Sequence, residues 1–273
     1  MVYKRILTIQ DISCVGQCSM TVAMPILSAC GHETCILPTA ILSTHTGGFG
    51  KPVIHKITVD MEAFWQHWYS QGVTFDAILV GYLGSLEAIG CAARIAEHLL
   101  APEGVFIVDP AMADHGKLYS GFDESYAEAM KQLCLRADVM MPNLTEAAMM
   151  AGVPWKESWE KAEIRELLEK LGGKNVVLTG VGFRQDQTGA ALRFEGEISF
   201  HHHERIPKNY HGTGDMFAAC FTGALMQGKT AVEAVEIASE FTCRSIRATY
   251  ESPAHWYGVK FETVLPWLAE TLQ

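Results

Sequence analysis

Short apolar runs rich in β-branched residues alternate along this chain with longer amphipathic stretches. The short runs predict strands, at Arg5–Gln10, Thr34–Pro38, Ala77–Gly81, Val105–Asp109, Val139–Met141 and Asn175–Thr179. The longer stretches predict helices, at Ser19–Ala29, Met61–Ser70, Ser85–Leu100, Glu124–Arg136, Thr145–Ala151 and Ser158–Leu171. Such alternation is typical of a mostly parallel sheet with helices on both faces, so we expect an α/β fold.

Two segments interrupt this alternation. Thr188–Phe194 and Glu197–His203 flank a Glu195-Gly196 turn and predict an antiparallel hairpin. Ser43–Thr58 is rich in Gly, Thr and His and predicts a loop or flap. The last part of the chain is helical again, with predicted helices at Asp215–Met226, Ala231–Tyr250 and Phe261–Thr271. Because no linker, repeat or low-complexity tract separates these elements, we expect a single domain over residues 1–273.

Composition and charge narrow the class of protein. The chain has 273 residues, of which 49% are hydrophobic and 19% charged, and this balance suits a globular core. Its formal net charge of −10 argues against nucleic acid or an anionic membrane as the main partner. The apolar run at the N-terminus is too short for a signal peptide, and no run is long enough to span a membrane. The eight cysteines form no C-x-x-C pair, so we expect free thiols, no zinc and a cytoplasmic location.

The segment His211-Gly212-Thr213-Gly214-Asp215 precedes an apolar, alanine-rich run that predicts a buried helix. Two glycines separated by one residue predict a tight turn. A turn that opens a helix directs unpaired N–H groups and the positive end of the helix dipole at one point. The pattern therefore indicates an anion site, with Asp215 as a base for an attacking hydroxyl group. An alternative stays open here, in which the segment is only a glycine-rich turn and Asp215 caps the helix.

Acidic and polar residues also follow other predicted strands. Asp109 and Asp114 bracket the end of one strand, and Asn143 and Glu146 follow the next strand along the chain. In a parallel sheet these strand ends share one edge, where ligands bind. Acidic groups gathered there would repel one another unless a cation such as Mg²⁺, carrying nucleotide phosphates, lay among them. The alternative is that Asp109 and Asn143 only cap the helices that follow them.

Other candidate motifs carry less weight. The chain has no G-x-x-x-x-G-K-[ST], so a P-loop is excluded, and it has no G-x-S-x-G or H-E-x-x-H. In His201-His202-His203, only the first and third side chains of a strand would share a face, which favours a surface strand over a metal site. Helical spacing in Phe64, Trp65, Trp68 and Tyr69 predicts core packing or a subunit contact.

Several segments together resemble the pyridoxal kinase family of the ribokinase-like superfamily, over nearly the whole chain. The Gly-x-Gly-Asp element is shared by the whole superfamily, whereas the Ile-Gln, His-Thr-Gly and Gly-Tyr-Leu-Gly segments are more specific to vitamin B6 kinases. The matching segments are Ile9-Gln10, Ser43-Thr44-His45-Thr46-Gly47, Gly81-Tyr82-Leu83-Gly84-Ser85, Val108-Asp109-Pro110 through Asp114, Pro142-Asn143-Leu144-Thr145-Glu146 and Gly212-Thr213-Gly214-Asp215.

The resemblance implies a three-layer α/β/α sandwich with a mostly parallel central sheet. It also implies an ATP-dependent kinase that phosphorylates the 5′-hydroxymethyl group of pyridoxal, pyridoxine or pyridoxamine. Asp215 matches the family's catalytic base. Gly212, Thr213 and Gly214 match the anion hole for the transferring phosphoryl group. The family also suggests a homodimer, and whether a monovalent cation is needed besides Mg²⁺ stays open.

The remaining site residues follow from the same resemblance. His45, Thr46 and Tyr82 match the pocket around the pyridine ring, and Asp11 matches a ring-contacting position. The positions around the nucleotide phosphates and cations are Asp109, Asp114, Asn143 and Glu146, and of these Asp109, Asp114 and Glu146 are the expected metal ligands. Thr179 and Gly180, at the end of a strand, match a nucleotide contact.

Two departures from the family pattern affect specificity. Many pyridoxal kinases have Ile-Gln-Ser where this chain has Ile-Gln-Asp, so Asp11 replaces a serine and the preferred vitamer stays open. Thr179-Gly180 stands where a Lys or Thr-Ser often follows the nucleotide strand, so the nucleotide preference stays open too. A hydroxymethylpyrimidine kinase of the same superfamily is the closest alternative, and a sugar or nucleoside kinase is more distant. An alternative from another class is a non-catalytic carrier of pyridoxal phosphate, but such a protein would have no need of a base at Asp215.

Overall fold

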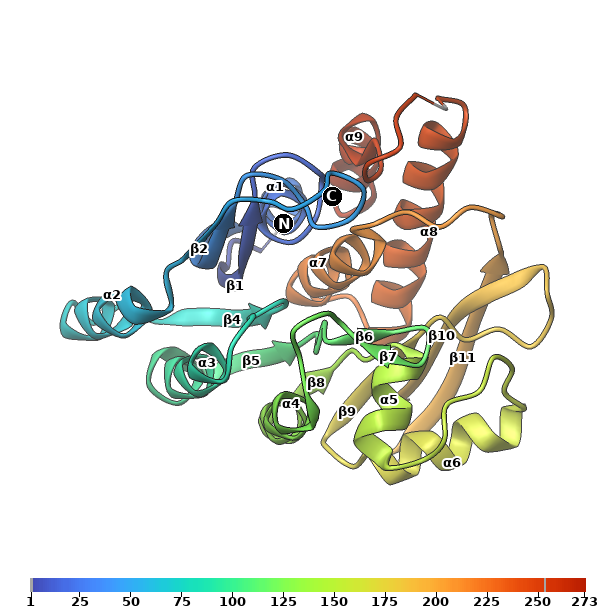
Figure 1. Ribbon diagram of the computed structural model, residues 1–273, viewed down its shortest axis with the longest axis horizontal. Helices are drawn as coiled ribbons and strands as arrows, with labels where there is room; N and C mark the ends of the chain where they lie inside the picture. Colours follow the sequence, from blue (N-terminus) through green and yellow to red (C-terminus); the bar gives the residue numbers. More distant parts are fainter. Residues whose placement is uncertain (1, 253) are drawn as a thin grey trace. The chain divides into compact units, whose positions relative to one another are not determined.

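The computed structural model describes residues 2–252 and 254–273. Its chain divides into two compact units. Unit 1 comprises Met1–Gly104 and Ile206–Gln273, and unit 2 comprises Val105–Arg205. Each unit is an α/β arrangement in which helices cover strands (Figure 1). The strand pairings are mostly parallel in unit 1, whereas unit 2 combines parallel and antiparallel pairings.

Unit 1 is built around β1 (Arg5–Ser13), which lies between β2 (Glu33–Leu42) and β4 (Phe75–Val80) and runs parallel to both. A short strand, β3 (Ile54–Lys56), pairs antiparallel with the end of β2. Ile6, Leu7 and Ile9 of β1 are fully buried, as expected for a strand that is covered on both faces. The carboxyl ends of β1, β2 and β4 therefore meet at one edge of this part of the sheet.

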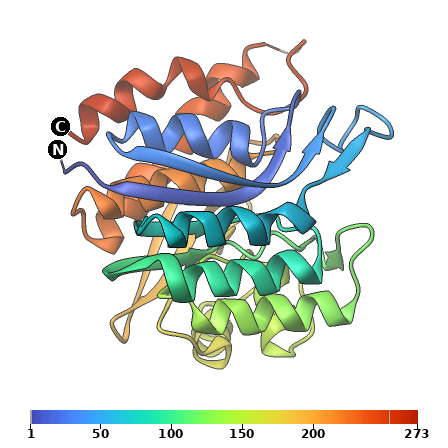
Figure 2. The same ribbon diagram turned by 90° about the vertical axis from the view of Figure 1, so that its left-hand side faces the viewer.

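The helices of unit 1 lie on both sides of its strands. Figure 2 shows α1 (Met20–Ala29) and α9 (Leu265–Thr271) on one side of β1 and β2, with α2 (Thr58–Ser70) and α3 (Leu86–Leu99) on the other. α7 (Thr213–Met226) packs against α1, and α8 (Ala231–Tyr250) packs against α7. The 3-10 helix η1 (Phe261–Thr263) contacts α8. A Cβ at Gly223 of α7 would lie 2.4 Å from the Cys30 Sγ, so glycine permits the close approach of α7 to the end of α1.

Unit 2 contains the end of β5 (Leu100–Val108), followed in the sheet by β8 (Val139–Met140) and β9 (Asn175–Thr179), all parallel. The antiparallel hairpin of β10 (Gln187–Phe194) and β11 (Glu197–Glu204) pairs with β9 and confirms the predicted hairpin. The helices are α4 (Glu124–Arg136), α5 (Leu144–Ala151) and α6 (Lys161–Leu171). A two-stranded ribbon of β6 (Ala113–Asp114) and β7 (Lys117–Leu118) precedes α4.

The prediction of a loop over Ser43–Thr58 is wrong at its end. Ile54–Lys56 forms β3 because Ile54 pairs with Leu42, and Thr58 already begins α2. The aromatic side chains of α2 are also not all buried in the core. Trp65 is 7% exposed and stacks on His98, whereas Phe64 is 44% and Tyr69 58% exposed. Among the described residues, no helix has the length and apolar character needed to cross a membrane.

Candidate active site

The Gly-x-Gly-Asp segment forms the N-terminus of α7 in unit 1. Gly212 is the residue that caps this helix, and its φ of 80° lies in the left-handed region. A Cβ there would lie 2.2 Å from the Gln17 carbonyl oxygen, so only glycine fits. The cap has no side-chain hydrogen bond, and Asp215 lies inside the helix, in its first turn. The alternative in which Asp215 is the N-cap is therefore wrong, and the first N–H groups of α7 have no side-chain acceptor.

Asp215 is held by a contact from a distant part of the chain. Its Oδ2 accepts a hydrogen bond of 2.9 Å from the backbone N–H of Ser19, 196 residues away in sequence. The residue is only half-buried, but its carboxyl group is desolvated. Burial raises the pKa of Asp215 to about 6, the Ser19 bond lowers it, and the charge of Asp11 raises it further. Such a carboxylate is a stronger base than an exposed one and is still mostly ionised at neutral pH.

Asp11 lies near Asp215 at the carboxyl end of β1, where the pairing with β2 is irregular. It is 4% exposed, and the Ser13 hydroxyl donates to its Oδ2 at 3.2 Å. Burial raises the pKa of Asp11, and hydrogen bonds from the side chains of Ser19 and Ser13 oppose that rise. The pKa of the half-buried Tyr82 is raised by burial and by the charge of Asp11. The structure thus brings together Asp11, Tyr82 and Asp215 from three separate segments.

The predicted flap contributes His45 to the same unit. The His45 N–H donates to the Val15 carbonyl at 2.8 Å, and its Nδ1 accepts from the Gly47 N–H at 3.1 Å. The His45 ring lies 4.7 Å from the ring of His211, next to the Gly212 turn. Burial and the neighbouring His211 lower the pKa of His45. Thr46 is exposed in the flap.

Two residues of this region were not among the predicted site residues. Ser19 could not be found from its own neighbours in sequence, because its role is the long-range bond to Asp215. His211 stands directly before Gly212, and that adjacency was a signal that could have identified it. The Gly47 position shows how closely the flap approaches His211, since a Cβ there would lie 2.7 Å from the His211 Nε2.

In unit 2, Asn143 and Glu146 form a reciprocal capping box at the start of α5. The Asn143 side chain accepts from the N–H groups of Thr145 and Glu146, and the Glu146 Oε2 accepts from the Asn143 N–H at 2.8 Å. The Glu146 Oε1 accepts from the Met112 N–H at 2.9 Å. Burial raises the pKa of Glu146 to about 7, although these backbone hydrogen bonds lower it. The prediction that Asn143 caps a helix is confirmed, but the same prediction for Asp109 is wrong, because the strand β6 and not a helix follows it. Glu146 connects α5 to the segment after β5.

The other predicted nucleotide and metal residues are more dispersed. The Asp109 Oδ1 accepts from the Ala111 N–H at 3.2 Å, directly after β5. Asp114 is exposed and accepts from its neighbour His115. At the end of β9, Thr179 donates its N–H to the Pro142 carbonyl, and Gly180 has a φ of 77° with open space beside it. Within the described ranges, no three acidic, His or Cys side chains are grouped closely enough to hold a metal ion.

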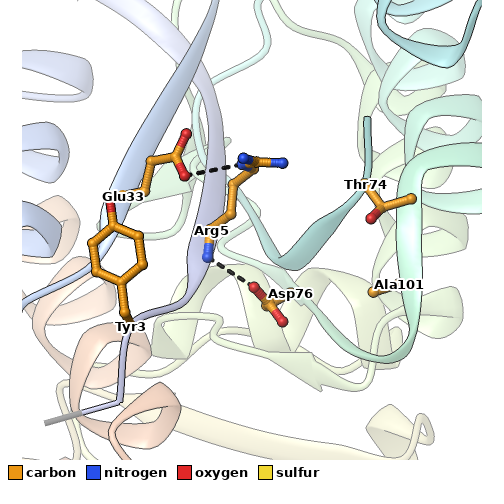
Figure 3. A pocket seen from close by; sticks show the side chains of 6 residues that line it. All are labelled: Tyr3, Arg5, Glu33, Thr74, Asp76 and Ala101. Carbon is orange, nitrogen blue, oxygen red and sulfur yellow. Dashed lines mark hydrogen bonds and ion pairs between the residues drawn. The ribbon is translucent and has the colours of Figure 1, made fainter. Parts of the chain in front are cut away.

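Each unit has a surface cavity whose lining includes none of the residues predicted for the site. The cavity of unit 1, of about 240 Å³, lies at the amino ends of β1, β2 and β4, opposite to the edge that carries Asp11. Figure 3 shows Arg5 there, with its guanidinium paired to Glu33 and its backbone N–H donated to Asp76. The cavity of unit 2, of about 320 Å³, is lined by Arg184, Asp186, Gln187, His202, His203 and Glu204.

Comparisons with known proteins agree with this arrangement. The family model for phosphomethylpyrimidine kinase matches residues 26–259. A pyridoxine/pyridoxal/pyridoxamine kinase from Bordetella avium is 31% identical over 261 residues, covering 89% of this chain and 85% of the relative. At 24% identity, the chain spans 44% of the length of a rice chloroplast relative described as a thiamine biosynthetic bifunctional enzyme.

Two solved structures share the fold over almost the full chain. Pyridoxal kinase from Lactobacillus plantarum has a TM-score of 0.91 at 32% identity, covering 98% of this chain and 97% of that one. A Bacteroides thetaiotaomicron protein described as a phosphomethylpyrimidine kinase and crystallised with pyridoxal has a TM-score of 0.92 at 33% identity, covering 97% and 95%. The chain therefore belongs to the phosphomethylpyrimidine kinase family and is a ribokinase-like kinase of the group that includes pyridoxal and hydroxymethylpyrimidine kinases.

Proposed function

We propose that this protein is an ATP-dependent kinase that phosphorylates the 5′-hydroxymethyl group of B6 vitamers. The observation that carries the proposal is the Asp215 carboxylate, held by the Ser19 N–H in the first turn of α7 with a pKa raised to about 6. In this reading Asp215 accepts the proton of the attacking hydroxyl group. The N–H groups of the Gly212, Thr213 and Gly214 turn stabilise the charge on the transferring phosphoryl group.

The acceptor is bound by groups of unit 1. Asp11, His45, Thr46 and Tyr82 surround the pyridine ring in this proposal. The relatives from Bordetella avium and Lactobacillus plantarum support a B6 vitamer as acceptor, and the Bacteroides thetaiotaomicron protein was crystallised with pyridoxal. A hydroxymethylpyrimidine acceptor is the second candidate, because the matching family model carries the name of phosphomethylpyrimidine kinase.

Unit 2 supplies the nucleotide groups. We assign Asp109, Asn143, Thr179 and Gly180 to the nucleotide, since they stand at the carboxyl ends of β5, β8 and β9. Mg²⁺ supplies charge stabilisation at the phosphates when bound. Asp109 and Asp114 have carboxylate oxygens suited to that cation. Both Glu146 oxygens already accept backbone N–H bonds, which fits a role in orienting the cation's water shell better than direct ligation.

The remaining assignments concern assembly and location. We propose a homodimer in which the exposed Phe64 and Tyr69 of α2 take part, because exposed aromatic side chains are enriched at such contacts. The eight cysteines are all free thiols, which suits a reducing cytoplasm. We make no assignment to nucleic acid or to a membrane, in line with the net charge of −10.

The test is ATP turnover against a panel of acceptors. The purified chain is assayed for ADP production with pyridoxal, pyridoxine, pyridoxamine, hydroxymethylpyrimidine and ribose, and the Asp215→Asn variant serves as the control for contaminating kinases. We expect the highest kcat/KM with a B6 vitamer. A higher kcat/KM with hydroxymethylpyrimidine would select the second candidate. Tight binding of pyridoxal phosphate without any turnover would instead support a non-catalytic carrier.

A further inference from the structure

An aromatic cluster joins the tip of the flap to the segment that follows α8. The Phe49 ring lies 4.6 Å from the ring of Trp256 and 5.5 Å from that of Tyr257, measured between centroids. Gly48 stands beside the same tryptophan with a φ of 84°. A Cβ at Gly48 would lie 2.4 Å from the Trp256 Cζ3, so a side chain there would push the ring away. The tip of the flap therefore packs closely on residues 254–258.

The same tip lies against the residue that precedes the Gly212 turn. A Cβ at Gly47 would lie 2.7 Å from the His211 Nε2, and the ring of His45 lies 4.7 Å from the ring of His211. Because these flap residues directly precede the aromatic contact in the chain, any group that fixes the tip also restricts His45. The contact after α8 therefore helps to hold His45 beside the start of α7.

The segment after α8 is anchored to the turn between β1 and α1. The Gln17 Nε2 donates to the Glu262 Oε1 at 2.7 Å, and the Gln17 Oε1 accepts from the His255 Nε2 at 2.8 Å. A Cβ at Gly258 would lie 2.6 Å from the Gln17 Cβ, so the two backbones approach closely there. Trp256 thus stands between two anchored neighbours, His255 and Gly258, and offers the flap a fixed surface.

The exposure of Trp256 distinguishes it from a core residue. Its side chain is 49% exposed, whereas tryptophan is highly buried on average. Its ring contacts are with Phe49 of the flap and with the neighbouring Tyr257. Trp256 therefore contributes little to the core of unit 1. A contact that remains half in water can also open and close, because water replaces part of what is lost.

We propose that Trp256 is a positioning residue for the acceptor, which acts by holding the tip of the flap in its closed position. This inference rests on the proposed function, in which His45 and Thr46 of the flap contact the pyridine ring. Closure places these two residues on the acceptor and keeps water from the transferring phosphoryl group. Opening of the contact at Trp256 lets the acceptor enter and the product leave.

The experiment removes the contact from each side. Trp256→Ala removes it from the segment after α8, Phe49→Ala removes it from the flap, and Trp256→Phe keeps an aromatic ring in place. Tyr250→Ala, at an aromatic residue of similar exposure (52%) at the end of α8, is the matched control. The first measurement is amide hydrogen exchange of residues 43–53, which needs no turnover. The second is the Kd for pyridoxal by calorimetry, together with KM and kcat for pyridoxal at saturating ATP.

We expect exchange of the flap to become roughly tenfold faster in Trp256→Ala and Phe49→Ala, because an aromatic pair holds the closed form. In the same two variants the Kd and KM for pyridoxal should rise by a similar factor, whereas kcat should change by less than about threefold. Trp256→Phe should recover much of both effects, and Tyr250→Ala should show neither.

Two results would overturn the inference. One is unchanged exchange of the flap in folded Trp256→Ala and Phe49→Ala proteins. The other is faster exchange with an unchanged Kd and KM for pyridoxal. Faster exchange and weaker pyridoxal binding in a protein without kinase activity would support the role of Trp256 in holding the flap and refute only the proposed function.

Discussion

Replacing Asp215 by Asn separates the proposed catalytic role of this carboxyl group from its effect on stability. The amide keeps the shape of the side chain and an oxygen that can accept the Ser19 N–H, but it cannot take a proton from a hydroxyl group. Loss of a general base lowers turnover by roughly a hundredfold or more. Because the groups assigned to ATP lie on other residues, the affinity for the nucleotide should change little.

The same change is expected to stabilise the protein. The pKa of Asp215 rises from 3.8 to about 6 on folding, so between these values the native state binds more protons than the unfolded state. Stability therefore falls as the pH rises through this window, and the full penalty is present above pH 6. At 1.36 kcal/mol per pKa unit, the penalty amounts to at most about 3 kcal/mol, which the Asn variant does not carry.

The assay combines kinetics with thermal unfolding. Turnover is measured with ATP and pyridoxal at neutral pH, and Tm is measured by calorimetry at about pH 4 and pH 7. We expect the Asn variant to exceed the parent in Tm by roughly 5–10 °C at neutral pH, and by less at the lower pH. Turnover within tenfold of the parent would refute the role as base. A Tm difference that does not grow with pH would refute the argument from burial.

Three further experiments test the remaining assignments. Alanine in place of Asp109, Asp114 or Glu146 should raise the Mg²⁺ concentration needed for half-maximal activity, most strongly at Asp109. An unchanged Mg²⁺ dependence in all three variants would refute the proposed cation position. Light scattering at micromolar concentration should show a dimer for the parent and a monomer for a Phe64→Ser/Tyr69→Ser double variant. A monomeric parent would refute the proposed homodimer. If Asp11 contacts the acceptor, Asp11→Ser should lower the kcat/KM ratio of pyridoxamine to pyridoxal, because an ionised Asp can only accept hydrogen bonds and favours a cationic partner. The same ratio in the variant and the parent would exclude this contact.

The local patterns of the sequence predicted most of the secondary structure. Glu124–Arg136, Asn175–Thr179 and Ala231–Tyr250 have the expected bounds. The capping box from Asn143 to Glu146 was also readable, because its partners are three residues apart. Short pairings such as β3 were missed, since three exposed residues carry almost no periodicity and depend on their partner strand for stability.

The site was harder to predict, because its decisive contacts join distant segments. The motif around Asp215 indicated a base, but the bond from Ser19 spans 196 residues and no local pattern reveals it. The Met112 bond to Glu146 spans 34 residues in the same way. The sequence could therefore identify chemically suited residues, whereas their burial, and hence the pKa values that distinguish their roles, depends on the tertiary structure.

Hydrogen bonding separates the buried carboxyl groups by role. Glu146 accepts from the N–H groups of Met112, Ala113 and Asn143, so its negative charge is largely compensated by groups that fix the local fold. Asp215 accepts one backbone N–H, and it faces a second acid, Asp11, instead of a cation. Replacing a carboxyl group that is held only for structure would lower the stability of the protein, whereas replacing Asp215 by Asn is expected to raise it. The incomplete compensation leaves a carboxylate oxygen of Asp215 able to accept a proton, and the proposed role as base would account for an otherwise destabilising charge at the start of α7.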